Sequence, residues 1–503
     1  MNKKGIGIIL GYLLIIAETL VGIMFTPILL KYLGNDEYGL YKLVVSWVSI
    51  VSILDFGLGG TITRYVIKYK TKGDSDGEAN FLGMAFFVYG VLAAIILLVG
   101  LIASFFLPEI SNSIPQDQYA EARYAFLILV VKTAVLLFNH AFTGWYTAYE
   151  CFAYNRLLAL GNIVLRLVLV MCLLPLKASI YVVVLVDLFL TCLQLIFNIA
   201  LSGRLLGTKP ILKRWDKKLF FDIMTFTTSL FLASIINQFN SNVDNIILGM
   251  TSTTSIVGLY SCALQIYVMY SSLSTTIQEV YLPSVSRTVF EKADNTEITK
   301  ALVRPSRMQV VILVLALEGF ILFGEEFLEI WVGHSYSSNE IKICYITGLI
   351  LLTSSTVQLF QNTTTCVLKA KKMLMGRVII TGISTFFNFI VTLFLTPRYG
   401  MIGAAVGTAV SMILGYGVAV NLYYKYHVGI KIQLYFKQTL HKLWYAALVT
   451  MFMGILIKKV FSQTMFFLFI KAILFILIYI CVIFCLGLTK EEKESVLKKR
   501  GRI

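Results

Sequence analysis

The sequence predicts an all-α polytopic membrane protein with fourteen transmembrane helices. Two features of its composition carry the prediction: 58% of the 503 residues are hydrophobic, and only 14% are charged. A third is their order, because the apolar residues gather in runs of the length that crosses a bilayer. About 20 apolar residues span the hydrocarbon core, so each run predicts one helix.

Six apolar runs precede the basic stretch at residues 204–218, and eight follow it. From the amino to the carboxyl end, the predicted spans are 7–33, 41–66, 80–107, 120–147, 155–175, 179–202, 222–250, 256–285, 308–331, 342–368, 374–396, 401–424, 441–460 and 464–487. An even number of spans places both ends of the chain on the same side of the membrane.

The positive charges sort the loops between the spans into two sets. One set, which includes both termini, holds 32 of the 43 Lys and Arg residues, and the other holds 8. Cytoplasmic loops collect Lys and Arg, so the bias predicts cytoplasmic termini and a multi-pass protein. The net charge of +16 then reflects topology, and we expect no nucleic-acid partner.

The halves of the chain are related by an internal repeat. The stretch Tyr38–Tyr41 (YGLY) has a weaker copy at Val257–Tyr260 (VGLY), and other landmarks recur at offsets near 220 residues. Since six helices are an even number, the repeat predicts two six-helix lobes of the same orientation enclosing a central cavity. The predicted parts are an N-terminal lobe (1–203), a basic cytoplasmic linker (204–221), a C-terminal lobe (222–424), and helices 13 and 14 with a basic tail (425–503).

Three charged residues fall at a similar depth in three consecutive spans: Lys132, Arg166 and Asp187. At about 1.5 Å per residue, all three lie roughly 12 to 18 Å below the outer surface, so we expect one polar layer. An ionised side chain at a helix centre costs about 2.5 to 3.5 kcal/mol, so each needs a partner or water. Two interpretations stay open: a cationic patch for a diphosphate or acidic sugar, or an Arg166–Asp187 ion pair that only holds helices together.

Two spans carry a polar stripe at helical spacing. One stripe includes Asn237 and Asn240, and the other includes Gln358 and Gln361. In a membrane, such a stripe lines a wet cavity or forms a hydrogen-bonded helix contact. We favour the cavity, with these amides as substrate-binding groups.

Four further charged residues have candidate roles. Asp244 and Glu18 are candidates for ion coupling, and Arg64 is either a positive-inside anchor or part of an entrance that attracts phosphate. Lys471 lies near the outer end of its span, so we expect it to snorkel towards the interface.

Soluble-enzyme chemistry has no sequence support. We find no phosphate-binding glycine loop, HExxH motif or GxSxG elbow. The eight cysteines are scattered along apolar runs without a CxxC pair, which indicates no zinc site. We therefore predict a transporter that is not an enzyme, with no cofactor and no metal site.

The chain resembles bacterial polysaccharide exporters of the multidrug/oligosaccharidyl-lipid/polysaccharide flippase superfamily, in particular the O-antigen and capsule repeat-unit flippases. The resemblance is carried by Leu33–Tyr41, by LDFGLGG (Leu54–Gly60) followed by Arg64, and by TPRYGMIGAAVGTAVS (Thr396–Ser411). It implies a cell-membrane protein that moves an undecaprenyl-diphosphate-linked oligosaccharide between leaflets by rocking of two lobes. Partners expected from it are the bilayer, a polysaccharide polymerase and other assembly proteins. Lys132 and Arg166 fit the cationic cavities described for the family.

Two alternatives stay open. A cation-coupled multidrug exporter of the same superfamily would need acidic residues at the cavity centre, and twelve helices would suffice. A membrane glycan polymerase or ligase handles the same lipid, but it would be expected to carry a large outer loop, which this sequence lacks.

Overall fold

The computed structural model describes residues 3–55, 58–110, 114–205, 208–291, 294–460, 465–490 and 492–494. Over these ranges the chain is helical and contains no strand, which confirms the predicted all-α class. Its contacts group into two compact units, Met1–Ser261 and Cys262–Ile503. The predicted division into lobes, linker and tail stays a prediction.

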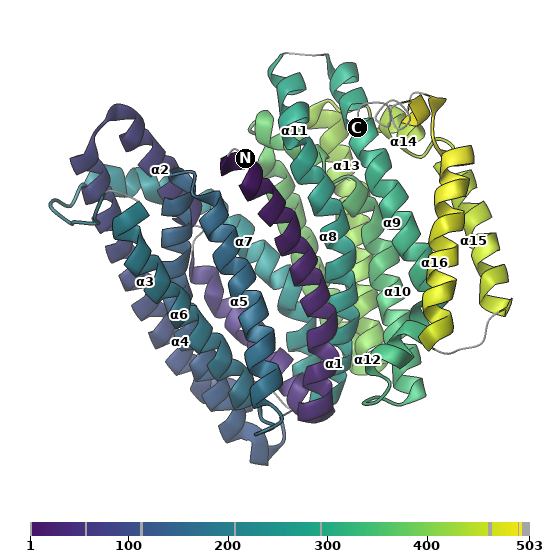
Figure 1. The fold of residues 1–503 in the computed structure, drawn as a ribbon, viewed down its shortest axis with the longest axis horizontal. Helices are drawn as coiled ribbons and strands as arrows, with labels where there is room; N and C mark the ends of the chain where they lie inside the picture. The colour runs from purple at the N-terminus through teal and green to yellow at the C-terminus, as the bar shows by residue number, and fades with distance from the viewer. Residues whose placement is uncertain are drawn as a thin grey trace. The chain divides into compact units, whose positions relative to one another are not determined.

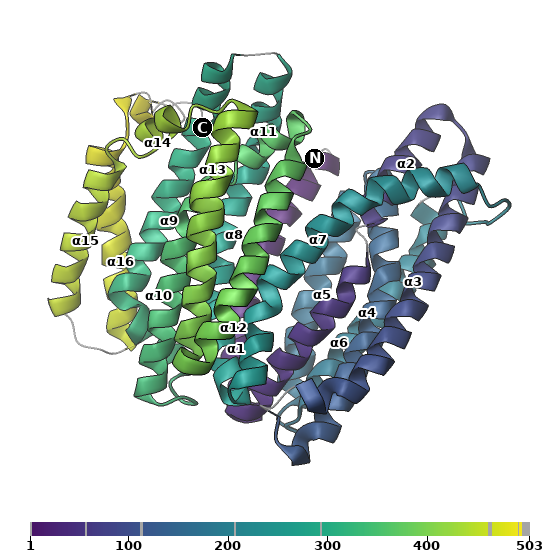
Figure 2. The same ribbon diagram turned by 180° about the vertical axis from the view of Figure 1, so that it is seen from behind.

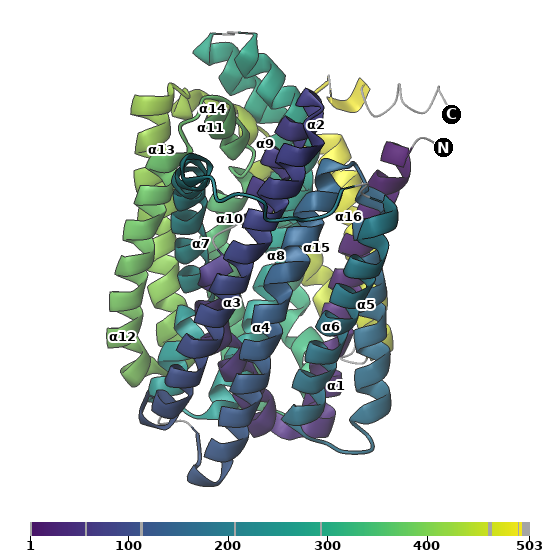
Figure 3. The same cartoon turned by 90° about the vertical axis from the view of Figure 1, so that its left-hand side faces the viewer.

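Unit 1 is a bundle of long helices. Its described elements are α1 (Lys3–Val51), a 3-10 turn (Ser52–Asp55), α2 (Leu58–Lys72), α3 (Ser75–Ile110), a second 3-10 turn (Gln116–Gln118), α4 (Tyr119–Ala148), α5 (Phe152–Leu173), α6 (Ile180–Leu205) and α7 (Lys217–Thr251). α4 is central, because it packs against both α3 and α6, and Figure 3 shows these three helices side by side.

A glycine divides α1 into two helices where the sequence predicts a turn. Gly34 is non-helical, with φ 78° and ψ 179°. A positive φ of this size favours glycine, because a Cβ would clash with the backbone. The first predicted span and the first part of the second therefore lie in one kinked element.

The two copies of the sequence repeat meet at Gly39. A Cβ on Gly39 would lie 1.8 Å from the carbonyl oxygen of Thr254 and 3.2 Å from the nitrogen of Gly258. Only a residue without a side chain permits this approach. The glycine that the two copies share thus brings the start of α8 (Thr254–Phe290) against α1.

The predicted second span is broken within LDFGLGG. α1 ends at Val51, and α2 begins only at Leu58. Gly59 serves close packing, because a Cβ on Gly144 of α4 would lie 2.3 Å from the carbonyl oxygen of Gly59. Thr63 of α2 adds a hydrogen bond of 2.8 Å to the Gly144 carbonyl.

Unit 2 contains most of α8 and the helices that follow it. These are α9 (Asn295–Val332), α10 (Ser338–Phe360), α11 (Thr364–Ala370), α12 (Leu374–Met412), a π-helical segment (Ile413–Ala419), α13 (Val420–Tyr423), a second π-helical segment (Tyr424–Val428), α14 (Ile432–Thr439), α15 (Leu443–Val460), α16 (Met465–Val482) and a third π-helical segment (Ile483–Gly487). α10 packs against α9 and α12, as Figures 1 and 2 show.

The breaks in unit 2 have local causes. Gly400 is non-helical inside α12, with φ 56° and ψ −137°, and it follows Pro397 by three residues. It lies where the sequence predicts two spans to separate. The predicted span 342–368 is instead interrupted between α10 and α11. α10 begins with a capping box, in which Ser337 and Glu340 satisfy each other's backbone N–H groups.

α15 and α16 are tied to α9 by buried polar contacts. Lys471 of α16 lies 2.8 Å from Glu326 of α9, and both side chains are buried. The prediction that Lys471 snorkels is therefore wrong, because a carboxylate within reach on α9 offers a partner in the interior. Thr450 of α15 donates to Glu318 of α9 at 2.6 Å.

The helices have the length and surface of membrane spans. Ten helices of the described part of the chain are long and apolar enough to cross a bilayer. Large apolar side chains cover the outer face of α3, where Leu98 and Phe105 are each 58% exposed. A soluble protein rarely exposes such a surface, whereas lipid covers it without cost. The count of fourteen spans stays a prediction.

Candidate functional site

The charged residues predicted to share a layer meet in unit 1. Asp187 of α6 accepts from Arg166 of α5, with Nε at 2.5 Å from Oδ1 and Nη2 at 3.1 Å from Oδ2. Lys132 of α4 lies with its Nζ 3.5 Å from Asp187 Oδ2. Equal depth on three neighbouring helices thus brought two cationic side chains to one carboxylate.

Both halves of α1 complete the cluster. Tyr41, in the second half, places its hydroxyl 3.0 Å from Arg166 Nη2. Phe25, in the first half, lies under the Arg166 guanidinium at 4.3 Å from its ring centre, a cation–π geometry. Sequence reasoning missed these two residues. The conspicuous LGNDEYGLY motif, which ends at Tyr41, was the available signal.

The cluster carries more positive than negative charge. Lys132 and Arg166 are 29% and 30% exposed, whereas Asp187 is 5% exposed. One buried carboxylate therefore balances two cations that both reach the surface of unit 1. An ion pair that only holds helices together would need one cation. The second positive charge can therefore attract an anion.

An uncharged network lies next to this cluster on α4 and α6. Asn139 donates to the Thr191 carbonyl at 3.0 Å and accepts from Asn198 at 2.9 Å. Tyr154 of α5 donates to Asn198 at 3.3 Å. Since Asn139 and Asn198 are buried, these bonds satisfy amides and hold the three helices in register.

Arg64 lies apart from the cluster. It is exposed on α2, and its neighbour Thr63 bonds to Gly144 of α4. By the helical rise, Gly144 and Lys132 lie about 18 Å apart along α4. Arg64 and Lys132 thus occupy different levels of unit 1, and the entrance role of Arg64 stays a prediction.

The predicted residues of α7 differ in exposure. Asn237 is exposed and Asn240 is half-buried, whereas Asp244 is buried. Asp244 accepts a hydrogen bond of 2.6 Å from Tyr260. Other polar residues of α7 contact α1, as where Asn245 donates to Ser46 at 3.1 Å. Part of the α7 stripe therefore forms a helix contact.

Glu18 is exposed on the first half of α1. By the helical rise it lies about 10 Å along the helix from Phe25. The structure gives it no place in the Arg166 cluster, and its ion-coupling role stays a prediction.

The two glutamines of unit 2 have different surroundings. Gln361 is buried and exchanges hydrogen bonds with Asn421, at 2.8 Å from Nε2 to Oδ1 and 3.4 Å in the reverse direction. Gln358 is half-buried, and its Oε1 has no hydrogen-bond partner among the described residues. Gln361 thus holds two segments of unit 2 together, whereas the buried Oε1 of Gln358 is an acceptor without a donor among the described residues.

A family model described as "Polysaccharide biosynthesis protein" matches residues 4–289, more than half of the chain. The chain belongs to this polysaccharide biosynthesis protein family. The predicted resemblance is confirmed, and this member of the family is a multi-pass membrane protein.

Two curated proteins are similar to this family member in sequence. A protein named "Probable flippase AglR", from Haloferax volcanii, is 30% identical over 184 residues. That match covers 36% of this chain and 37% of AglR, so the chain aligns with only part of AglR's length. "Uncharacterized membrane protein EpsK" from Bacillus subtilis is 23% identical, covering 95% of this chain and 94% of EpsK.

Two solved structures share the fold of this family member. The lipid II flippase MurJ, in an inward closed conformation, matches with a TM-score of 0.75 and 17% identity over 94% of this chain and 98% of MurJ. An inward-facing multidrug resistance MATE family transporter of the MOP superfamily matches with a TM-score of 0.68 and 13% identity, over 81% of this chain and 96% of the transporter. At these identities, the likeness establishes the fold.

Proposed function

We propose that this protein is a flippase that moves an undecaprenyl-diphosphate-linked oligosaccharide from the inner to the outer leaflet of the bacterial cell membrane. Both termini would lie in the cytoplasm, and a polysaccharide polymerase and other assembly proteins would take the product. One observation carries the proposal: the Lys132, Arg166 and Asp187 cluster holds an excess positive charge within the membrane-spanning helices.

The diphosphate would bind at this cluster. Lys132 supplies an ammonium group with three donors, and its contact with Asp187 is long at 3.5 Å. Arg166 is fixed by Asp187 and Tyr41, so it presents its charge in a constant orientation. In a low-dielectric setting, two cations that share one carboxylate favour the approach of a second anion.

The remaining candidates would act around this anchor. We propose Asn237, Asn240 and Gln358 as contacts for sugar hydroxyls, whereas Gln361 would first have to release Asn421. Arg64 would attract the diphosphate at the cytoplasmic end. We further propose that Asp244 or Glu18 binds the ion that drives transport. The two lobes would give access to the two sides of the membrane in turn.

A cation-coupled multidrug exporter is the second candidate, because MATE transporters share the fold. An exporter of cationic drugs needs an acidic centre, since opposite charges attract in a poorly screened site. The excess charge of the Lys132 cluster has the other sign. Efflux of a cationic dye is the property that would favour the exporter.

The test is deletion of the gene in its host, with lipid-linked oligosaccharide quantified in each leaflet by its access to an external glycosidase. We expect shielded, inner-leaflet oligosaccharide to accumulate and surface polysaccharide to be lost. Re-expression of the wild-type chain should restore both. If oligosaccharide still reaches the outer leaflet in the deletion strain, and the strain has lost efflux of a cationic dye, the protein is an exporter and the flippase proposal is wrong.

A further inference from the structure

A second basic site lies in unit 2, outside the residues considered above. It is a cavity of about 810 Å³, within the 300 to 1,000 Å³ that is usual for small-ligand sites. Basic side chains from three separate segments dominate its wall. The lining residues are Lys300, Val303, Arg304, Arg307, Leu434, Lys437, Gln438, His441, Thr489, Lys490 and Glu492.

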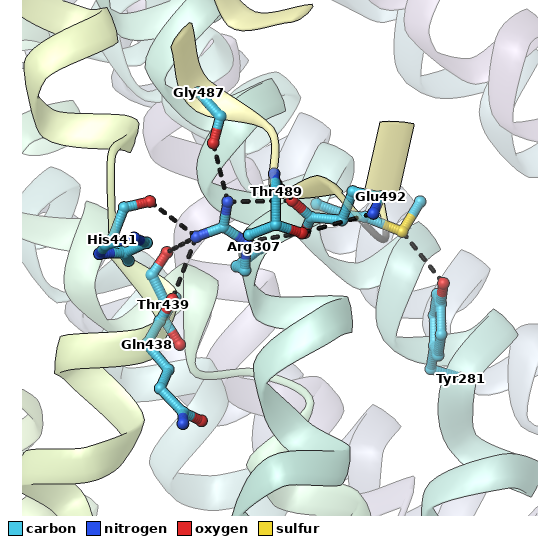
Figure 4. A network of polar contacts seen from close by, with 9 residues as sticks. Tyr281, Arg307, Gln438, Thr439, His441, Gly487, Thr489 and Glu492 are labelled. Atoms are coloured by element: carbon cyan, nitrogen blue, oxygen red, sulfur yellow. Dashed lines mark hydrogen bonds and ion pairs between the residues drawn. The ribbon is translucent and has the colours of Figure 1, made fainter. Parts of the chain in front are cut away.

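Arg307 of α9 holds these segments together. It is buried, and its Nε and Nη2 donate to the Glu492 carboxylate at 2.7 and 3.0 Å. Nη2 also donates to the Gly487 carbonyl at 2.9 Å. Nη1 donates to three carbonyls at the end of α14, those of Gln438, Thr439 and His441, at 3.0, 3.2 and 2.9 Å (Figure 4).

The planar guanidinium suits this task. Its donors point in fixed directions, and the carbonyls at the end of α14 lack partners within their own helix. One side chain therefore ties α9 to the end of α14 and to the segment after α16. The cavity is thus a built feature of the fold, with walls in fixed positions.

The charge of Arg307 is balanced within this junction. Burial alone would raise the pKa of Glu492, but hydrogen bonds from Arg307 and from the Thr489 backbone outweigh it and hold the pKa below its ordinary value. Glu492 is therefore ionised at neutral pH and neutralises Arg307. The Arg307–Glu492 pair therefore adds no net charge to the wall.

Three further residues of the wall are lysines. Lys300 comes from α9, Lys437 from α14, and Lys490 from the segment after α16. All three are exposed, and no acidic side chain of the described chain forms an ion pair with them. The cavity therefore has an uncompensated positive wall.

The length of α9 and the predicted start of its apolar run indicate that Lys300 lies beyond the hydrocarbon core, near the lipid headgroups. α9 has 38 residues, which corresponds to about 57 Å, whereas the hydrocarbon core is roughly 30 Å thick. The apolar run predicted as a span begins at residue 308, so Lys300 precedes it by two turns. In Figure 1, the end of α8 and the start of α9 project together beyond α10.

We propose that this cavity binds an anionic phosphate group through Lys300, Lys437 and Lys490, either the headgroup of a membrane lipid or a soluble diphosphate. Ammonium groups bind phosphate as point charges, and three lysines from three segments line this one cavity. The position at the membrane surface gives access to both sources. The site is independent of the proposed flippase activity, because it shares no residue with the Lys132 cluster.

The test uses the full-length protein purified in detergent. Inorganic pyrophosphate binding is measured by titration calorimetry, and phosphatidylglycerol binding by native mass spectrometry with phosphatidylcholine as the neutral reference. The double variant Lys300→Gln/Lys437→Gln should weaken binding at least tenfold. Its matched control, Lys369→Gln/Lys425→Gln, removes two exposed lysines of unit 2 that lie outside the cavity and should change affinity less than twofold.

The two probes distinguish the sources of the phosphate. Pyrophosphate binding without lipid would assign the site to a soluble diphosphate, whereas a preference for phosphatidylglycerol with no pyrophosphate binding would assign it to a lipid headgroup. The proposal is overturned if neither probe binds the wild-type protein, if the cavity variant binds normally, or if both double variants lose affinity equally.

Discussion

Two lysines in the membrane-spanning helices form ion pairs of different character. Lys471 lies 2.8 Å from Glu326, with side chains 0% and 7% exposed. Lys132 lies 3.5 Å from Asp187 and is 29% exposed, and Arg166 shares the same carboxylate. The first pair is closed and neutral, whereas the second is open and carries excess positive charge. Charge balance and exposure therefore separate a structural ion pair from a candidate binding site.

The largest effect is expected from breaking the closed pair. Lys471→Met leaves Glu326 buried without its partner, which costs about 3 to 5 kcal/mol in comparable buried pairs. We expect a lower midpoint of thermal unfolding in detergent and less protein in the membrane. The matched variant, Lys471→Met/Glu326→Leu, removes both charges and should recover most of the stability. A single variant that unfolds at the wild-type temperature would contradict the structural role.

A smaller effect is expected at the neighbouring carboxyl of α9. Thr450→Val removes the hydroxyl that donates to Glu318 at 2.6 Å. A buried acceptor that loses its donor costs about 1 to 3 kcal/mol, so the same unfolding assay should show an intermediate shift. The control is Thr347→Val, because Thr347 is also buried and bonds only to the Ile343 carbonyl of its own helix. Equal shifts in both variants would show that Glu318 does not need Thr450.

Depth along the helices predicted that the charged residues of the Lys132 cluster meet, but it did not predict the two residues of α1 that join them. Lys132, Arg166 and Asp187 lie on consecutive spans, so equal depth was enough to bring them together. Tyr41 and Phe25 escaped prediction because α1 is distant in the sequence. Only the folded chain shows that both its halves reach Arg166.

Position along a helix did not predict the side-chain contacts that depend on which helix packs against it. Lys471 lies near a span end, which predicts snorkelling, but α9 packs against α16 and offers Glu326. Gln361 belongs to a polar stripe, and a stripe alone does not distinguish a cavity wall from a contact such as the one with Asn421. The fold class was predictable because the length and polarity of the runs are local properties. Pairings between helices are not local.

Lys132→Gln should have the smallest effect on stability and still stop transport. Arg166 keeps its two bonds to Asp187 in this variant, so no buried charge is left alone. A partly exposed pair contributes about 1 kcal/mol or less, and the unfolding midpoint should hardly move. Replacing Arg166 instead would leave Asp187 with only the distant Lys132, which would mix a folding defect with a binding defect.

The export readout then separates the two interpretations of the open cluster. In the leaflet assay, Lys132→Gln should lower outer-leaflet oligosaccharide at least tenfold, because it removes the excess cation. The control Lys177→Gln removes an exposed lysine that follows α5 and should export normally. If Lys132→Gln also exports normally while Arg166→Leu/Asp187→Leu folds and exports, the cluster only holds helices together. Export that fails in Lys132→Gln at wild-type abundance and unfolding midpoint would instead assign the excess charge to the substrate, because the fold would then be intact without it.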